Sequence, residues 1–270
     1  MSRTSWTSPR LWVVATPIGN LSDLTPRARE VLSDVAVILA EDTRRSGLLC
    51  QRAGIPSPGF LSLHEHNEEA RVKRVLGVLD SGRSAALVSD AGTPLLGDPG
   101  YRLVRAVREA GFDVSPVPGP FAPAAALSAA GLPPLPFAFL GFVPRSKGDL
   151  RRVLQPYAEL PASLAFFERP SRLPQTLALA AGILGGEREA CLARELTKQH
   201  EEFILGCLDE LAAKAEDSAE ALKGEVTVLV GPPVRGRAGS DEIERVLREE
   251  AERGGKPAKS PGVPRSDWRG

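Results

Sequence analysis

The chain has 270 residues, of which 42% are apolar and 25% are charged, and this is ordinary composition for a globular protein. Lysine plus arginine and aspartate plus glutamate both number 34, so the formal net charge is zero. The neutral balance excludes a nucleic-acid-binding protein that works by bulk charge, so any RNA binding must come from a local basic patch. No window approaches the roughly 20 apolar residues of a membrane helix, and residues 1–10 lack the apolar stretch of a signal peptide.

The three cysteines, Cys50, Cys191 and Cys207, are far apart in the chain and form no CxxC motif. We therefore expect neither a disulfide framework nor a structural zinc site. The cysteines are interpreted as small apolar residues in a reducing environment, and the predicted location is the cytoplasm.

Short apolar runs alternate with helical patterns through the first 117 residues. Thr25 is the expected N-cap of the first helix, with Pro26 at its first position. Further helices are expected over 67–80 and 101–110, and strands over 11–15, 35–40, 85–89 and 114–117. The alternation predicts an α/β domain with a mostly parallel sheet.

A second α/β region is expected to begin near the proline-rich stretch 132–136, after a helix at 122–130. Its expected strands are 138–142, 163–167, 190–194, 202–207 and 225–230, and its helices are 146–157, 171–184 and 208–214. Residues 240–253 predict a charged helix, and the Pro, Gly and Ser content from Gly254 predicts a disordered tail. The predicted organisation is an N-terminal α/β domain (1–120), a C-terminal α/β domain (121–234) and a charged helix with its tail (235–270).

Three loops follow predicted strands of the first region, at 16–20, 41–45 and 90–100. Ligands of open α/β sheets bind outside the carboxyl ends of the strands. Residues 89–100 read SDAGTPLLGDPG, and such glycines let the backbone approach a ligand closely. An elaborate surface loop is the alternative interpretation. The chain contains neither GxGxxG nor GxxxxGK[ST], which disfavours a nicotinamide enzyme or a P-loop kinase.

Several long strings in this order resemble the ribosomal RNA 2′-O-methyltransferase branch of the tetrapyrrole-methylase superfamily. They are VVATPIGNLSDLTPRA (13–28), AEDTRR (40–45), HEHNE (64–68), LVSDAGTPLLGDPGYRLV (87–104), PGPFAPAAALSAAGLP (118–133) and ELTKQHEE (195–202). The resemblance covers about residues 11–231. It implies two α/β domains with S-adenosylmethionine in the cleft between them. It further implies a homodimer whose substrate is a cytidine 2′-hydroxyl of 16S rRNA, in or near the decoding region of the small ribosomal subunit.

The resemblance also assigns residues to the cofactor. Carried to matching positions, these are Ile18, Ala91, Gly92, Thr93, Leu96, Phe121, Ala122, Phe167 and Leu196, to which we add Asp90 because it precedes the glycine loop. This chain departs from the family at Leu96-Gly97, where Ile-Ser is usual, and at Phe121, where a small residue is usual. The larger ring would either crowd the cofactor or stack near it.

Methyl transfer to a ribose hydroxyl needs alignment, exclusion of water and a group that accepts the proton. Glu41 is one candidate base because it follows an apolar strand directly. Lys198 is the other, provided that desolvation depresses the pKa of its amine.

The remaining polar residues near these loops are expected to form a substrate rim. Its predicted members are Asp42, Arg44, Arg45, His64, His66, Arg145 and Glu201. Carboxylates would orient the ribose and arginines would contact phosphates. The alternatives are a capped helix start with a salt bridge at 41–45 and a solvated loop at 64–68. No metal is expected, because two histidines two residues apart lack a clear third ligand. Phe166 and Phe167 are expected in the core rather than as a base-stacking platform.

Two other functions stay open at this point. One is a tetrapyrrole or precorrin C-methyltransferase of the same fold, and the AEDTRR and HEHNE strings argue against it. The other is a non-catalytic S-adenosylmethionine-binding module, against which the polar clusters argue.

Overall fold

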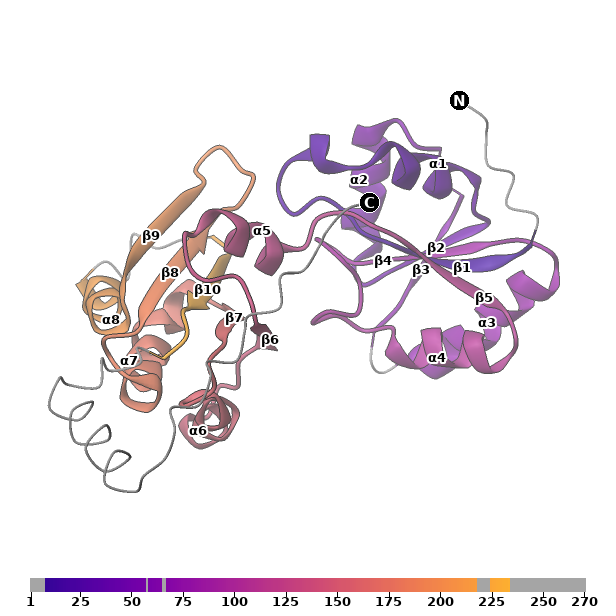
Figure 1. Ribbon diagram of the computed structural model, residues 1–270. Coiled ribbons are helices and arrows are strands. Elements are labelled where there is room, and N and C mark those ends of the chain that lie inside the picture. The colour runs from indigo at the N-terminus through magenta and orange to yellow at the C-terminus, as the bar shows by residue number, and fades with distance from the viewer. Residues whose placement is uncertain (1–7, 57, 65–66, 218–223, 234–270) are drawn as a thin grey trace, which may run out of the picture. The chain divides into compact units, whose positions relative to one another are not determined.

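The computed structural model describes residues 8–56, 58–64, 67–217 and 224–233. Residues 1–233 form one compact unit, which contains two five-stranded sheets (Figure 1). The predicted helix at 240–253 and the predicted tail lie outside the described residues. The predicted domain boundary between residues 120 and 121 falls between the two sheets and stays a prediction.

The first sheet is parallel throughout and has the order β3-β2-β4-β1-β5. Four of its strands lie where the sequence predicts them. The fifth, β3, is only three residues long and was not predicted. The strands are β1 (Arg10–Val14), β2 (Val37–Ala40), β3 (Phe60–Ser62), β4 (Ala85–Val88) and β5 (Asp113–Val117).

Helices cover both faces of this sheet (Figure 1). α1 (Pro26–Asp34) and α2 (Thr43–Ala53) lie on one face, and α3 (Glu68–Asp80) and α4 (Tyr101–Glu109) lie on the other. The short 3-10 helix η1 (Leu21–Asp23) precedes α1. β1 and β4 are neighbours whose next helices, α1 and α4, cover opposite faces. The carboxyl ends of β1 and β4 therefore form a topological switch point, where open α/β sheets bind ligands.

The second sheet is mixed and has the order β6-β7-β10-β8-β9, in which only β6 and β7 pair in parallel. Its strands are β6 (Phe137–Phe142), β7 (Ser163–Glu168), β8 (Glu189–Arg194), β9 (Glu202–Cys207) and β10 (Val226–Val230). Its helices are α5 (Ala122–Ala129), α6 (Lys147–Leu154), α7 (Leu173–Leu184) and α8 (Leu208–Asp217), with 3-10 turns η2 (Gln155–Tyr157) and η3 (Pro170–Arg172).

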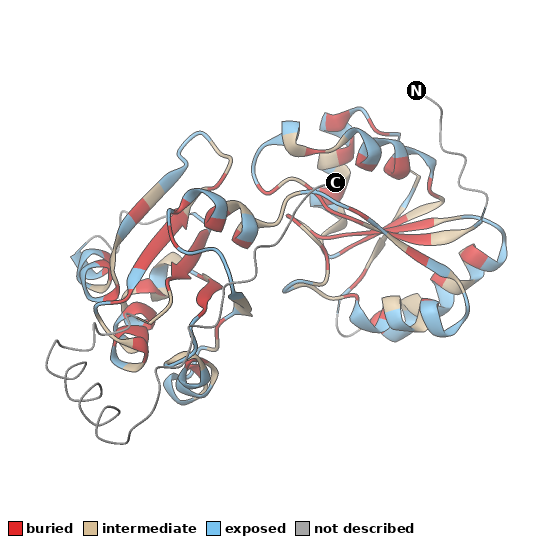
Figure 2. Cartoon of the chain, viewed as in Figure 1, coloured by how far each residue is buried: buried red, intermediate tan, exposed pale blue. Residues whose placement is uncertain are grey.

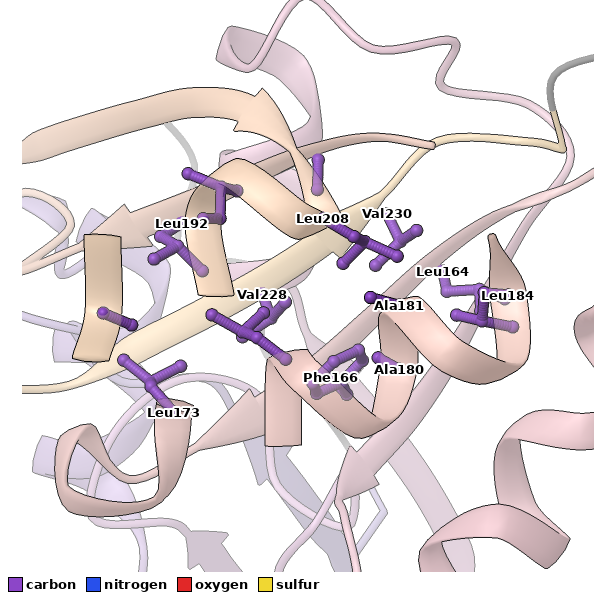
Figure 3. Packing of buried hydrophobic residues seen from close by; sticks show 14 of the residues in the cluster. Leu164, Phe166, Leu173, Ala180, Ala181, Leu184, Leu192, Leu208, Val228 and Val230 are labelled. Atoms are coloured by element: carbon purple, nitrogen blue, oxygen red, sulfur yellow. The ribbon is translucent and has the colours of Figure 1, made fainter. Parts of the chain in front are cut away.

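The second sheet has an apolar core on each face. Phe166 and Val228 point toward α7 and α8, where they pack in one cluster with Leu173 and Leu208 (Figure 3). The opposite face packs against α5. Burial is concentrated on the strands and on the inner sides of the helices (Figure 2). No helix among the described residues is long and apolar enough to cross a membrane.

One charged side chain is fully buried at the end of this sheet. Arg188 has no exposed surface and donates hydrogen bonds to the carbonyl oxygens of Gly231 (2.8 Å), Tyr157 (3.1 Å) and Ala162 (3.2 Å). Burial lowers the pKa of the guanidinium, against the raising effect of nearby Glu159 and Glu187. Because one side chain satisfies three carbonyls, Arg188 ties η2, the start of β7 and the end of β10 together.

Candidate active site

A cavity of about 930 Å³ lies at the carboxyl edge of the first sheet. The loops after β1, β2, β3 and β4 line one side of it, and residues 121–122, 142, 167–170, 196 and 224–227 line the rest. The carboxyl ends of parallel strands share one edge of a sheet, so loops that are distant in sequence meet there. The volume suits a small-molecule ligand, for which sites of roughly 300–1,000 Å³ are typical.

The loops after β1 and β4 are fastened to each other. Thr16 and Gly92 exchange two backbone hydrogen bonds of 2.9 and 3.0 Å, and the Thr16 hydroxyl donates to the Ser89 carbonyl at 3.1 Å. The Thr93 hydroxyl in turn donates to the Pro120 carbonyl at 3.0 Å. These contacts hold the glycine-rich loop in one conformation beside the cavity.

The backbone around the cavity adopts conformations that side chains rarely accept. Among the described residues, the three non-glycine positions with positive φ are Leu95 (72°), Glu195 (51°) and Thr197 (64°). Leu95 lines the cavity, and the other two flank Leu196, which also lines it. Such strained backbone clusters at ligand sites because the surrounding structure holds it there.

Two glycines permit close approach at this site. A Cβ on Gly19 would lie 2.7 Å from the Leu196 carbonyl oxygen, so the loop after β1 contacts the loop after β8 only because residue 19 is glycine. Gly92 has a φ of +82°, and a Cβ there would lie 3.3 Å from Ile18. Both positions therefore shape the wall of the cavity.

All ten residues predicted to bind the cofactor line this one cavity. They are Ile18, Asp90, Ala91, Gly92, Thr93, Leu96, Phe121, Ala122, Phe167 and Leu196. The structure thus brings them together, and their role toward a cofactor stays a prediction. The unusual Phe121 packs edge-on against Phe139, with ring centroids 5.2 Å apart, so its ring is part of the wall.

The predicted rim residues divide into two groups. Arg45 and His64 line the cavity together with the candidate base Glu41, whereas Asp42, Arg44, Arg145, Lys198 and Glu201 do not contribute to its lining. His66 lies outside the described residues. The Glu201 carboxylate accepts a 2.6 Å hydrogen bond from the Thr197 amide, and this bond helps to hold the strained loop after β8.

Asp42 and Arg44 form the start of α2. The Asp42 carboxylate accepts a hydrogen bond of 2.9 Å from the Arg44 amide, which caps the helix, and it pairs with the Arg44 guanidinium at 2.8 Å. Hydrogen bonds from Arg44 lower the pKa of Asp42 to about 2. The capped helix start with a salt bridge, the alternative at this segment, is therefore what the structure contains. The Arg44 side chain is nevertheless 90% exposed and accessible to a phosphate.

Three carboxylates from the loops of the first sheet, those of Glu41, Asp90 and Asp98, line the cavity, and Glu168 and Glu225 line it from the side of the second sheet. Asp90 accepts from the Asp42 amide at 3.1 Å and pairs with Arg45 at 3.3 Å. Burial, and then the charge of Asp90, raises the pKa of Glu41, against the lowering effect of Arg45. The cluster concentrates negative charge where a cationic ligand would be attracted.

Asp98 is a functional candidate that the sequence analysis missed. Burial, followed by the charge of Glu41, raises the pKa of Asp98 to about 6, although a hydrogen bond with Ser89 opposes the shift. A carboxylate with such a pKa is a better proton acceptor near neutral pH than an ordinary one. The signal available in the sequence was its position within SDAGTPLLGDPG, because this string follows β4 and most of its residues line the cavity.

Lys198 lies in an environment that does not suit a neutral amine. Its Nζ pairs with Glu195 at 3.0 Å and with Glu225 at 3.1 Å. Burial lowers the pKa of Lys198, but the hydrogen bonds to both carboxylates outweigh burial and raise it. Depression of this pKa, on which the role of Lys198 as a base depends, is therefore contradicted in the free protein. The assignment of Glu41 as the base stays a prediction.

Comparison of the sequence with models of known protein families gives a match over most of the chain. The family model for tetrapyrrole (corrin/porphyrin) methylases matches residues 10–212, which is more than half of the chain. The chain belongs to the tetrapyrrole methylase family.

Several relatives within this family are more than 40% identical in sequence to this chain over most of their length. A protein of Mesorhizobium japonicum named ribosomal RNA small subunit methyltransferase I is 45% identical over 239 residues, covering 88% of this chain and 81% of the relative. Proteins of the same name from Pseudomonas aeruginosa and Escherichia coli are 48% and 47% identical, each over 82% of this chain and over 78% and 77% of the relative.

Solved structures of more distant tetrapyrrole methylases share the fold. A cobalt precorrin-4 methyltransferase superposes with a TM-score of 0.64 at 16% identity, covering 86% of this chain and 97% of its own. The uroporphyrin-III C-methyltransferase of Thermus thermophilus, solved with S-adenosylhomocysteine, gives 0.57 at 20% identity, covering 84% and 99%. The α/β fold expected from the sequence is thus confirmed.

Proposed function

We propose that this protein transfers a methyl group from S-adenosylmethionine to a cytidine 2′-hydroxyl in 16S rRNA, and that it acts in the cytoplasm as a homodimer. The observation that carries the proposal is identity of 45–48% to ribosomal RNA small subunit methyltransferases over 82–88% of the chain. The distant corrinoid and porphyrin enzymes match at 16–22% identity, so they support the fold and not their substrates.

The residues around the cavity fit this cofactor. Ile18, Ala122 and Leu196 supply apolar surface beside the glycine loop, and Asp90 supplies negative charge toward an ammonium or sulfonium group. Bound there, S-adenosylmethionine would provide a methyl group activated by positive sulfur. The chain's own task is to orient the ribose hydroxyl, to exclude water and to accept the proton.

Glu41 is proposed as the proton acceptor. It directly follows β2 and lines the cavity, and burial raises its pKa toward the range in which a base is effective. Asp98 lines the same cavity and shares negative charge with Glu41, so a proton taken by one carboxylate would be stabilised by the other. Arg45, which pairs with Asp90, would orient the substrate at the rim.

Cofactor binding is tested first. Calorimetry with S-adenosylmethionine in the presence of a chelator should show one molecule bound per chain, because the predicted cofactor residues include no metal-ligand set. Saturable binding without added metal supports the proposal. Absence of binding under these conditions contradicts it.

Substrate choice is tested by transfer of a radiolabelled methyl group. Small ribosomal subunits, naked 16S rRNA and uroporphyrinogen are offered in parallel, and nuclease mapping with mass spectrometry locates any label. We expect 2′-O-methylcytidine in rRNA. Label in uroporphyrinogen would instead support a C-methyltransferase, and cofactor binding with no label in any substrate would indicate a binding module.

A further inference from the structure

The edge strand β6 contains an irregularity that brings an aromatic side chain to the cavity. Phe139 pairs with Ala165 of β7, and Phe142 pairs with Phe167. Three steps along β6 therefore match two steps along β7, which is a β-bulge. Without the extra residue, Phe139 and Phe142 would point to opposite faces of the sheet, because side chains alternate along a strand.

Gly141 provides the backbone conformation of the bulge. Its φ is +66°, and a Cβ built there would meet nothing within 4 Å. The glycine is thus needed for conformation and not for space. Bulges are over-represented next to active sites, where they redirect a side chain.

The redirected Phe142 completes a series of four aromatic rings. Centroid distances are 5.2 Å from Phe121 to Phe139, 5.1 Å from Phe139 to Phe167 and 5.1 Å from Phe167 to Phe142. The inner rings are supported on both sides, whereas Phe142 ends the series, lines the cavity and is 62% exposed. An aromatic ring that contacts a neighbouring ring on one side and is open to the cavity on the other is a platform for stacking.

We propose that Phe142 stacks on a nucleobase of the RNA substrate and so positions the target nucleotide at the carboxylates of the first sheet. The inference rests on the proposed function and adds the substrate-contacting residue to it. Single-stranded RNA is recognised largely by stacking of unpaired bases on aromatic side chains. A ring that holds the base in this way would also fix the position of the ribose attached to it.

The experiment compares Phe142→Leu with Phe142→Tyr. Leucine keeps apolar surface but loses the ring face, whereas tyrosine keeps the face. The probe is a short single-stranded oligoribonucleotide containing pyrrolocytidine, whose fluorescence falls when the base stacks. We expect quenching by the wild type and by Phe142→Tyr, and for Phe142→Leu lost quenching with a Kd about tenfold higher or more. Leu205→Ala, which removes an exposed apolar side chain outside the cavity lining, should change nothing.

A second variant tests the bulge. Gly141→Ala keeps Phe142 but disfavours the positive φ, so it should reduce quenching while circular dichroism stays normal. If Phe142→Leu keeps both the quenching and the affinity for the oligoribonucleotide, the stacking proposal is overturned. It is also overturned if the variant loses as much affinity for S-adenosylmethionine as for RNA. A higher KM for small subunits with unchanged oligonucleotide binding would overturn it as well, since the ring would then contact a ribosomal protein.

The two proposals fail differently. If the wild type transfers no methyl group to rRNA, the proposed function fails whatever Phe142 does. If the wild type methylates rRNA and Phe142→Leu is equal to it in KM, kcat and quenching, only the stacking inference fails.

Discussion

Glu41 directly follows β2 and lines the same cavity as Asp90 and Asp98, so its carboxylate is placed to accept a proton. Replacement by glutamine keeps the shape and removes the basicity. We expect Glu41→Gln to lower turnover at least about tenfold, as loss of a positioned base does, with the Kd for S-adenosylmethionine nearly unchanged. Glu30→Gln, at an exposed position of α1, is the matched control. Full turnover by Glu41→Gln would move the base to Asp98 or to water.

Asp98 should make folding stability depend on pH. Its folded pKa of about 6 lies above the ordinary aspartate value of 3.8, so the folded state binds more protons between these values and the free energy of unfolding falls as pH rises through them. Asp98→Asn removes this loss. Thermal melts should show the variant to be more stable than wild type above pH 7, with the difference changing little from there upward and shrinking toward pH 4. A difference independent of pH would contradict the raised pKa.

At the scale of elements, the start of α2 separates two arginines by their partners. Arg44 pairs with Asp42 outside the cavity lining, whereas Arg45 pairs with Asp90 inside it. Arg44→Ala should therefore lower the affinity of the protein for RNA and reduce the salt dependence of that affinity by roughly one unit of slope. The affinity for the cofactor should stay unchanged. Arg45→Ala should affect both ligands. An unchanged slope for Arg44→Ala, measured by RNA titration at several salt concentrations, would show that Arg44 is structural.

The contact between the loops after β1 and β4 is the other element-scale feature. Gly92 bonds twice to Thr16 while holding a φ of +82°. Alanine at this φ costs about 1–2 kcal/mol and would contact Ile18. We expect Gly92→Ala to lower the melting temperature, measured in thermal melts, and to lower the affinity for S-adenosylmethionine, measured by calorimetry. Gly77→Ala, inside α3 and with open space around its Cβ, should instead be neutral or stabilising.

For the whole molecule, the question is whether the two sheets unfold together. Ile18 of the first half packs in a core cluster with Leu127 and Leu196 of the second, so we expect one transition. Arg188→Lys should destabilise by about 3 kcal/mol, because an ammonium cannot satisfy the same carbonyls. Fluorescence of Trp12, in a background with Trp6 and Trp268 replaced by phenylalanine, reports the first sheet. The unfolding midpoint of Arg188→Lys followed by Trp12 fluorescence should be lowered as much as the midpoint followed by circular dichroism. Separate midpoints would show two independently unfolding domains.

The sequence by itself determined the alternation of strands and helices, because buried strands and capped helices leave local patterns in 11–15, 25–34 and 85–89. It also determined the family, since its motifs are long and ordered. β3 escaped prediction because three residues carry too little pattern. The tertiary structure decided which polar residues meet. Asp98 and Phe142 reach the cavity through a folded loop and a bulge, and Lys198 stays charged because Glu225, distant in sequence, lies beside it. These depend on contacts across the chain, which local periodicity does not encode.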